Sequence, residues 1–295
     1  MDDVGLMTER IDAHHHVWDL AVRDQPWMTG DGVDPLRRSF GIDEFVTQAQ
    51  ANGVGASVVV QAVADISETE ELLDLAAATP EVAGVVGWVD LAAADVGERL
   101  DRLSARPSGR WLVGIRSLVQ YEPDPAWLAR PAVLDGLREV AARGLVNELL
   151  IVPHQLEAVA AAASEIGESR FVLDHLGKPA IAIATWEPWA TDLAAVAHCD
   201  NVSAKISGLV TEADWSAWTA DDVCPYLEHA LSIFGPDRLL FGSDWPVCTL
   251  AASYERVVEL AETFVGGLSA TDRAAVLGGN ATEIYSLQPA RREAP

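Results

Sequence analysis

Two segments near opposite ends of the chain hold residue types that could do chemistry. His14 and His16 lie in the run Ile-Asp-Ala-His-His-His-Val-Trp, and Asp244 follows the run Leu-Leu-Phe-Gly-Ser. Residues two apart on a β-strand point to the same side, so the two imidazoles face one way. Two imidazoles and a carboxylate can hold a metal ion or a reacting carbonyl group. The pattern therefore predicts a hydrolase, and a pair of hydrogen-bonded core histidines is the alternative.

The elements that must position these residues recur along the chain. Short apolar runs rich in Val, Ile and Leu predict strands of a parallel sheet with both faces covered. These strands are expected at residues 11–17, 56–62, 83–89, 112–119, 146–152, 171–176, 202–208 and 239–244. Helices are expected at residues 43–52, 67–79, 95–105, 131–143, 155–167, 186–198, 221–234 and 253–265. This alternation predicts an α/β fold, the (β/α)₈ TIM barrel. An open doubly wound sheet fits less well, because no Gly-rich dinucleotide loop follows the first strand.

Size and composition limit the domain organisation and the partners. The 295 residues, 49% of them hydrophobic, predict a single barrel domain over residues 1–295, with its core at about 9–287 and a frayed end at 288–295. The net charge of −25 excludes nucleic acid and anionic membrane as partners. The chain shows no signal segment and no long uncharged apolar stretch, so we expect a cytoplasmic protein.

Polar residues late in the predicted strands are the candidates for a site, because barrels of this kind build their active sites at the carboxyl ends of the strands. Beyond the three residues above, the candidates are Gln61, Trp88, Asp90, Arg116, His154, Asp174, His175 and Lys205. Buried charges such as Arg116 and Lys205 cost several kcal/mol unless they are paired. We therefore expect them to join a network, which is either a structural one at the barrel mouth or an active site.

Seven segments resemble those of a known family. They are IDAHHHVWDL, VVVQAVAD, VVGWVDL, VGIRSLVQ, VLDHLGKP, AKISGLVTEADW and LLFGSDWPVC. The family is the amidohydrolase-related family of the amidohydrolase superfamily, and the resemblance is to its sugar-lactonase branch, which includes L-fuconolactonase and L-rhamnonolactonase-like enzymes. It covers roughly residues 9–287, and it implies a (β/α)₈ barrel that hydrolyses the ring of a sugar lactone.

The resemblance also implies roles for individual residues. His14 and His16 correspond to the family's strand-one pair, His175 to its strand-six histidine, Asp244 to its strand-eight carboxylate and Arg116 to its strand-four arginine. Asp244 is expected to be the general base, the histidines to polarise the carbonyl group, and Arg116 to orient the substrate. Further substrate contacts are expected from Gln61, Trp88, His154, Lys205, Trp27 and Trp245.

The metal content and the exact reaction have open alternatives. In the superfamily's two-metal pattern, a carbamylated lysine late in strand four or five bridges two ions. This chain has no lysine at either place, so it departs from that pattern and a two-metal centre is not expected. One divalent ion, with Zn²⁺ the first choice, would be held by His14, His16 and Asp244, with His175 as a further ligand; catalysis without metal is the other alternative. Hydrolysis of a carboxylated catabolic lactone, metal-dependent decarboxylation and non-catalytic sugar binding also stay open. The family resemblance and the apolar helices leave a homodimer open.

Overall fold

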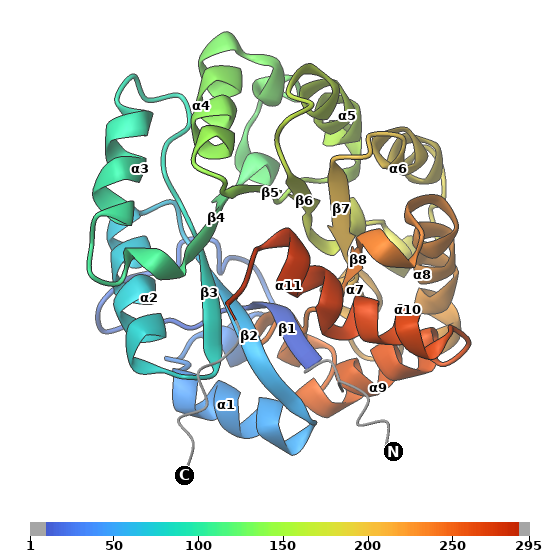
Figure 1. Cartoon of the computed structure of the whole chain (residues 1–295). Coiled ribbons are helices and arrows are strands. Elements are labelled where there is room, and N and C mark those ends of the chain that lie inside the picture. The colour runs from blue at the N-terminus through green and yellow to red at the C-terminus, as the bar shows by residue number, and fades with distance from the viewer. Residues whose placement is uncertain (1–9, 289–295) are drawn as a thin grey trace, which may run out of the picture.

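Eight parallel strands form the centre of the molecule and lie side by side in chain order. The structure is a computed structural model that describes residues 10–288. The strands are β1 (Arg10–His15), β2 (Val54–Val60), β3 (Val82–Gly87), β4 (Leu112–Ser117), β5 (Val146–Leu149), β6 (Phe171–Leu173), β7 (Val202–Lys205) and β8 (Leu239–Leu240). Backbone hydrogen bonds from Ala13 N to Phe241 O (2.9 Å) and from Asp244 N to His14 O (2.8 Å) join β1 to the chain after β8. The strands thus close into a ring (Figure 1), which confirms the predicted (β/α)₈ barrel and excludes the open sheet.

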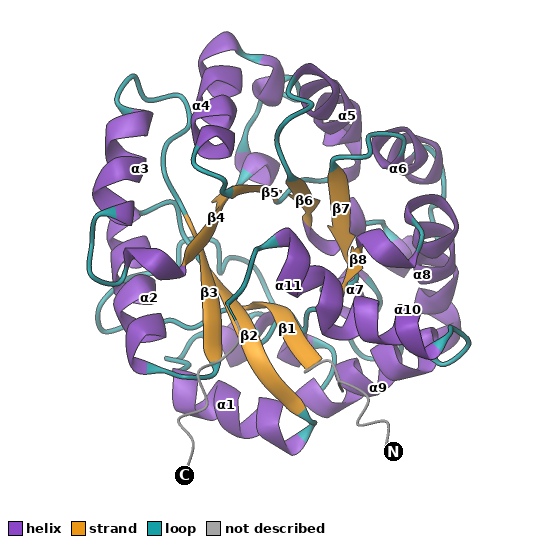
Figure 2. Cartoon of the chain, in the orientation of Figure 1, coloured by secondary structure: helices purple, strands orange, loops and turns teal. Residues whose placement is uncertain are grey.

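Helices surround the ring of strands on its outside (Figure 2). Those that alternate with the strands are α1 (Ile42–Ala51), α2 (Ile66–Ala78), α3 (Val96–Ser104), α4 (Pro131–Ala142), α5 (Leu156–Glu165), α6 (Trp189–Ala197), α8 (Ala220–Phe234) and α9 (Tyr254–Val265). Each lies within a few residues of a predicted helix. Three short helices were not predicted from the sequence: α7 (Leu209–Glu212), α10 (Ala270–Ala274) and α11 (Asn280–Ile284). Among residues 10–288, no helix has the length and apolar character needed to cross a bilayer.

Neighbouring residues along a strand belong to two different apolar cores. Val59 packs in the layer between strands and helices, whereas Val58 and Val60 belong to the core inside the barrel. The inner core also contains Tyr285 and Leu287, which follow α11. Figure 1 shows α11 in front of the ring of strands. The end of the chain therefore fills the amino end of the barrel and leaves the carboxyl ends of the strands for a site.

The predicted strands were wrong in their carboxyl-terminal limits. Strand β6 ends at Leu173 and not at residue 176, and β8 ends at Leu240 and not at residue 244. His175 (φ 53°) and Asp244 (φ 58°) have left-handed backbone conformations, which no extended strand contains. The apolar pattern continues past the strand ends because the loop residues are themselves buried, so hydrophobicity could not mark the true limits. Most of the predicted frayed end lies outside the described residues.

Candidate active site

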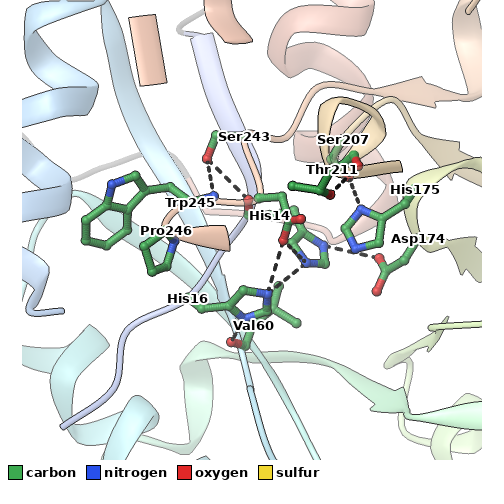
Figure 3. A network of polar contacts seen from close by, with 12 residues as sticks. His14, His16, Val60, Asp174, His175, Ser207, Thr211, Ser243, Trp245 and Pro246 are labelled. Atoms are coloured by element: carbon green, nitrogen blue, oxygen red, sulfur yellow. Dashed lines mark hydrogen bonds and ion pairs between the residues drawn. The ribbon is translucent and has the colours of Figure 1, made fainter. Parts of the chain in front are cut away.

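Three candidate residues converge at the carboxyl end of the barrel; Figure 3 shows two of them, His14 and His16, beside each other. The Nε2 atoms of His14 and His16 are 3.2 Å apart. The Oδ1 atom of Asp244 lies 3.7 Å from Nε2 of His14 and 3.5 Å from Nε2 of His16. All three side chains are almost completely buried. The fold therefore brings the early histidine pair and the late carboxylate, which are about 230 residues apart in the chain, into one small space.

His16 has a fixed protonation pattern. Its Nδ1 atom lies 2.7 Å from the carbonyl oxygen of Val60 at the end of β2, so Nδ1–H donates to that oxygen. Burial lowers the pKa of His16, although a hydrogen bond with Asp244 acts in the opposite direction. A neutral imidazole with its proton on Nδ1 has its lone pair on Nε2. His16 thus presents an electron pair to His14 and Asp244.

His14 has two self-consistent tautomers. Its Nδ1 atom lies 3.0 Å from Nζ of Lys205 and 3.2 Å from Oδ1 of Asp174. If Lys205 donates to Nδ1, the proton of His14 is on Nε2 and points at the lone pair of His16. If Nδ1–H instead donates to Asp174, Nε2 of His14 also carries a lone pair, which can bind a cation or accept an N–H of Arg116, whose Nη1 lies 3.4 Å away. Burial lowers the pKa of His14 well below its usual value, so the doubly protonated form does not compete.

The second tautomer fits a single metal ion. In a tetrahedral zinc site, nitrogen and oxygen ligands at roughly 2.0–2.1 Å from the ion are about 3.3–3.4 Å from one another. The three separations among His14, His16 and Asp244 are 3.2, 3.7 and 3.5 Å, close to that value. Asp174 then has the role that carboxylates take behind metal-binding histidines, accepting the other imidazole proton. A second group of potential ligands, His14, Asp174 and His175, shares His14 with the first.

His175 and Asp244 face each other across a glycine. Oγ of Ser207 lies 2.9 Å from Nδ1 of His175. The next residue, Gly208, has φ +66°, and a Cβ atom there would lie 2.5 Å from Nδ1 of His175 and 3.1 Å from Oδ2 of Asp244. Only glycine permits this close approach of the β7 loop. Gly208 was missed in the sequence analysis, although its position in the Ser-Gly pair after β7 is a signal for such an approach.

The charge states of these two residues suit acid–base chemistry. Burial lowers the pKa of His175 to about 4, so this imidazole is neutral at pH 7. Burial alone raises the pKa of Asp244, but the neighbouring His175 and His16, which become positively charged when protonated, outweigh burial and lower the pKa. Asp244 is therefore an ionised carboxylate among neutral imidazoles, which is the state required of a general base or a metal ligand.

A buried network of charges lies beneath the histidines. Nζ of Lys205 is 2.6 Å from Oε1 of Glu148 and 3.3 Å from Oδ1 of Asp174. Nη1 of Arg116 is 3.2 Å from Oδ2 of Asp174, and the hydroxyl group of Tyr285 donates to Oε2 of Glu148 at 2.6 Å. The sequence analysis missed Glu148 because this residue lies in the middle of β5 and not at its end. The signal available was an acidic residue inside an apolar strand, which must be paired when it is buried.

The chain matches a known family over nearly all of its length. A family model described as amidohydrolase matches residues 11–287. The L-fucono-1,5-lactonase of Burkholderia multivorans is 40% identical over 292 residues, which cover 94% of this chain and 96% of that protein. The chain belongs to the amidohydrolase family. This assignment confirms the family resemblance predicted from the motifs.

Solved structures agree with the fold of this amidohydrolase. A crystal structure of an amidohydrolase from Burkholderia multivorans with bound HEPES has a TM-score of 0.89 and 38% identity, with 95% of this chain and 100% of that chain covered. A second crystal structure, of an amidohydrolase from the same organism with bound zinc, has a TM-score of 0.87 and 39% identity, with the same coverage. The family therefore includes a close structural relative that has been seen with zinc.

The pocket of this amidohydrolase is a cavity of about 110 Å³. Of the predicted residues, it is lined by His16, Trp27, Arg116, His175 and Asp244. Residues that the sequence analysis missed also line it, among them Gln120, Tyr121, Lys178 and Thr211. They come from the segments after β4 and β6 and from the short helix α7 after β7, whose side chains no strand periodicity could place. His14 and Lys205 are fully buried behind the pocket.

Besides Lys205, four residues expected to contact the substrate do not line this pocket. Gln61 is buried below it, where its backbone carbonyl accepts a hydrogen bond from Nη2 of Arg116. His154 is exposed, and Trp88 is half-buried after β3. The indole ring of Trp245 packs against Phe40, with ring centres 5.4 Å apart, and points away from the imidazoles (Figure 3). These side chains are thus structural or peripheral in the described residues.

Proposed function

We propose that this protein hydrolyses the ring of a sugar-acid lactone, an aldonolactone. The observation that carries the proposal is an ionised, buried Asp244 beside two neutral imidazoles and Arg116 in one small pocket. Relatives at 40% and 36% identity, both from Burkholderia, are L-fucono-1,5-lactonases, and they support this substrate class. A sugar-binding protein without catalysis would have no use for a buried general base, because burying an ionised group is costly.

Asp244 serves as the general base in the proposed reaction. Its Oδ1 atom faces His14 and His16, whereas Oδ2 lies on the side of Gly208. A water molecule beside Oδ2 gives its proton to the carboxylate and attacks the lactone carbonyl carbon. The bond between that carbon and the ring oxygen then breaks, and the proton passes from Asp244 to the departing ring oxygen. The products are a carboxylic acid and a free hydroxyl group, so atoms and charges balance.

The oxygen of the attacked carbonyl becomes negatively charged and needs donors or positive charge directed at it. The Arg116 guanidinium lies at the wall of the pocket and is held there by Asp174 at 3.2 Å. Bound to His14, His16 and Asp244, one divalent ion such as Zn²⁺ would supply Lewis-acid polarisation of the carbonyl group. Arg116 also offers a planar pair of donors for the ring oxygen or for sugar hydroxyls.

The charge balance of the pocket favours a neutral polyol over a dicarboxylate substrate. Arg116 is paired with Asp174, and Lys178 is paired with Glu212, with 3.3 Å between Nζ and Oε1. Both cations that line the pocket are thus already balanced by carboxylates. A substrate with several carboxylates would require unpaired positive charge, which the described residues of the pocket do not offer.

Replacing the general base tests the proposal directly. Asp244→Asn should lower kcat by roughly 100-fold or more, the range for removal of a general base, and leave the far-UV circular dichroism spectrum unchanged. Activity is followed by proton release in weak buffer with a panel of five- and six-membered aldonolactones and one carboxylated lactone. Asp90→Asn removes an exposed carboxylate in the loop after β3 and is the matched control. Turnover of Asp244→Asn within a few-fold of wild type would refute the assigned role.

A further inference from the structure

We infer that Glu68 is a positioning residue, which holds the end of strand β2 so that the backbone carbonyl of Gln61 there orients Arg116. Oε2 of Glu68 accepts hydrogen bonds from the backbone N–H groups of Ala62 at 3.0 Å and Val63 at 2.9 Å. Glu68 is on α2, outside the barrel, and it does not line the catalytic pocket. Its carboxylate thus reaches the active site only through the backbone.

The contact between β2 and the site passes through consecutive peptide groups. The carbonyl of Val60 accepts the Nδ1–H of His16 at 2.7 Å, and the carbonyl of Gln61 accepts a hydrogen bond from Nη2 of Arg116. The next two N–H groups along the chain, those of Ala62 and Val63, are the ones bound by Glu68. A planar peptide group joins the carbonyl of one residue to the N–H of the next, so the Ala62 N–H fixes the direction of the Gln61 carbonyl. The Val60 carbonyl is fixed separately, through the Gln61 N–H, which donates to Val86 O at 2.9 Å. The Glu68 carboxylate therefore holds the peptide group whose carbonyl orients the substrate-binding arginine.

Burial shows that this carboxylate is kept at a cost. Glu68 is only 3% exposed, and a buried carboxylate without a hydrogen-bonded partner is strongly unfavourable. Burial raises its pKa to about 7, against the effect of the two backbone hydrogen bonds. An alanine or leucine at this helix position would avoid that cost. A role in holding the β2 backbone explains why an acidic side chain stands here.

Helix α2 is a firm support for such a role. The residue after Glu68, Thr69, accepts the backbone N–H of Trp88 through Oγ1 at 2.7 Å, just beyond β3. A Cβ atom on Gly87 would lie 2.2 Å from Cγ2 of Thr69, so the helix and the strand end are in close contact. Arg23, in the loop after β1, donates to Asp65 at the start of α2 at 2.9 Å. The start of α2 is therefore fixed to the loops that follow β1, β2 and β3.

The test compares three substitutions at Glu68 with a matched control. Glu68→Leu removes both hydrogen bonds, Glu68→Gln keeps a neutral oxygen at the same distance, and Glu68→Asp shortens the side chain by one methylene group. Glu70→Leu changes a half-exposed glutamate of the same helix, which faces Arg106 at 3.4 Å, and serves as the control. We expect about a 100-fold lower kcat for Glu68→Leu, the effect of a small misplacement of catalytic groups. Glu68→Gln should lose less than about 10-fold, because its amide oxygen still accepts the same N–H groups.

A second readout does not depend on the substrate. In protein labelled with ¹⁵N-arginine, the Nη2–H resonance of Arg116, assigned with Arg116→Lys, reports the hydrogen bond to the Gln61 carbonyl. Only the kcat readout rests on the proposed function. If the protein cleaves no lactone, the proposed lactonase function fails, but the resonance still tests the positioning role of Glu68. A shifted or lost resonance in Glu68→Leu, or in Glu68→Asp if the leucine variant does not fold, supports the inference.

Glu68 would have a purely structural role if its folded variants melted at a lower temperature but kept the Arg116 resonance and a kcat within about 2-fold of wild type, measured well below their melting points. That result would overturn the inference, and so would an equal loss of kcat in Glu70→Leu. Recovery of the resonance in Glu68→Gln, but not in Glu68→Leu, is the pattern that positioning through the two N–H groups requires.

Discussion

Removal of the Lys205 ammonium group should destabilise the fold in a way that a second substitution repairs. Lys205 is fully buried and is the nearest cation to Glu148, at 2.6 Å, while Asp174 has a second cation, Arg116, at 3.2 Å. Lys205→Met keeps a side chain of similar length and removes the charge. Glu148 then becomes the carboxylate that has lost its partner. The Tyr285 hydroxyl donates a hydrogen bond to Oε2 of Glu148, but a neutral hydroxyl group does not replace the positive charge of Lys205.

The size of the effect follows from the burial of the pair. Breaking a buried ion pair on one side costs roughly 3–5 kcal/mol. An unfolding entropy of about 2.1 cal/mol/K per residue gives roughly 0.6 kcal/mol/K for 295 residues. The Tm of Lys205→Met should therefore fall by about 5–8 °C. In the double variant with Glu148→Gln no unpaired charge is left, so a large part of this loss should return, as a coupling energy of about 1–3 kcal/mol.

The loss of stability in Lys205→Met should also depend on pH. Burial, followed by the charge of Asp174, raises the pKa of Glu148 from 4.5 to about 7 in the folded protein. An acid whose pKa is raised by folding loses stability as the pH rises from its unfolded to its folded pKa. Without Lys205 the folded pKa is higher still, so Glu148 stays protonated at pH 6 and is forced towards ionisation at pH 8. The Tm difference between Lys205→Met and wild type should be larger at pH 8 than at pH 6.

The assay is calorimetric or circular-dichroism melting of four proteins, the wild type, both single variants and the double variant, at both pH values. A chelator in every buffer removes any stabilisation by bound metal. A Tm of Lys205→Met within about 1 °C of wild type would show that Lys205 does not neutralise this network. Additive effects of the two substitutions would show that Glu148 is not the group it neutralises.

Two further predictions concern the pocket. Arg116→Lys should raise KM and lower kcat/KM by roughly 10- to 100-fold, because an ammonium group cannot replace the planar guanidinium group that contacts Asp174 and the Gln61 carbonyl. Steady-state kinetics with the best lactone substrate measures both constants. Unchanged kinetics would show that Arg116 does not orient the substrate. Purified protein should contain about one equivalent of a divalent metal by elemental analysis, and the His16→Gln variant should contain less. A metal-free protein that keeps full turnover after chelation would instead assign His14 and His16 to direct contact with the lactone.

Much of the fold and the central site could be predicted from the sequence, for a physical reason. Parallel strands buried on both faces are continuously apolar, so their number and order are visible in the sequence. Polar residues that interrupt such runs, as His14, Arg116 and Lys205 do, are costly and must therefore be paired. The histidine pair and Asp244 could be placed together because barrel strands all deliver their carboxyl ends to one face.

The remaining features depend on the third dimension. Glu148 lies inside strand β5, whereas active-site residues of a barrel are expected at the strand ends, so the sequence did not indicate it as a site residue. Trp245 follows Asp244 directly, but the left-handed conformation of Asp244 turns the chain, so the indole ring packs against Phe40 and not into the pocket. Lys178 lines the pocket from a loop after β6, whose conformation no periodicity reveals. The loop backbone and not the residue type decided the positions of Trp245 and Lys178.

The tautomer of His14 connects the buried charges with the chemistry of the pocket. Lys205 and Asp174 compete for the same Nδ1 atom at 3.0 and 3.2 Å, and the outcome decides whether Nε2 carries a proton or a lone pair. Lys205 also contacts Glu148, so the ion pair between Glu148 and the Lys205 ammonium group competes with the contact to His14 and affects which tautomer of His14 forms. An ionised Glu148 favours the tautomer that can bind a cation, whereas a protonated Glu148 releases Lys205 to donate to Nδ1. In the proposed single-metal site, the network beneath the pocket would thus set whether His14 can act as a ligand.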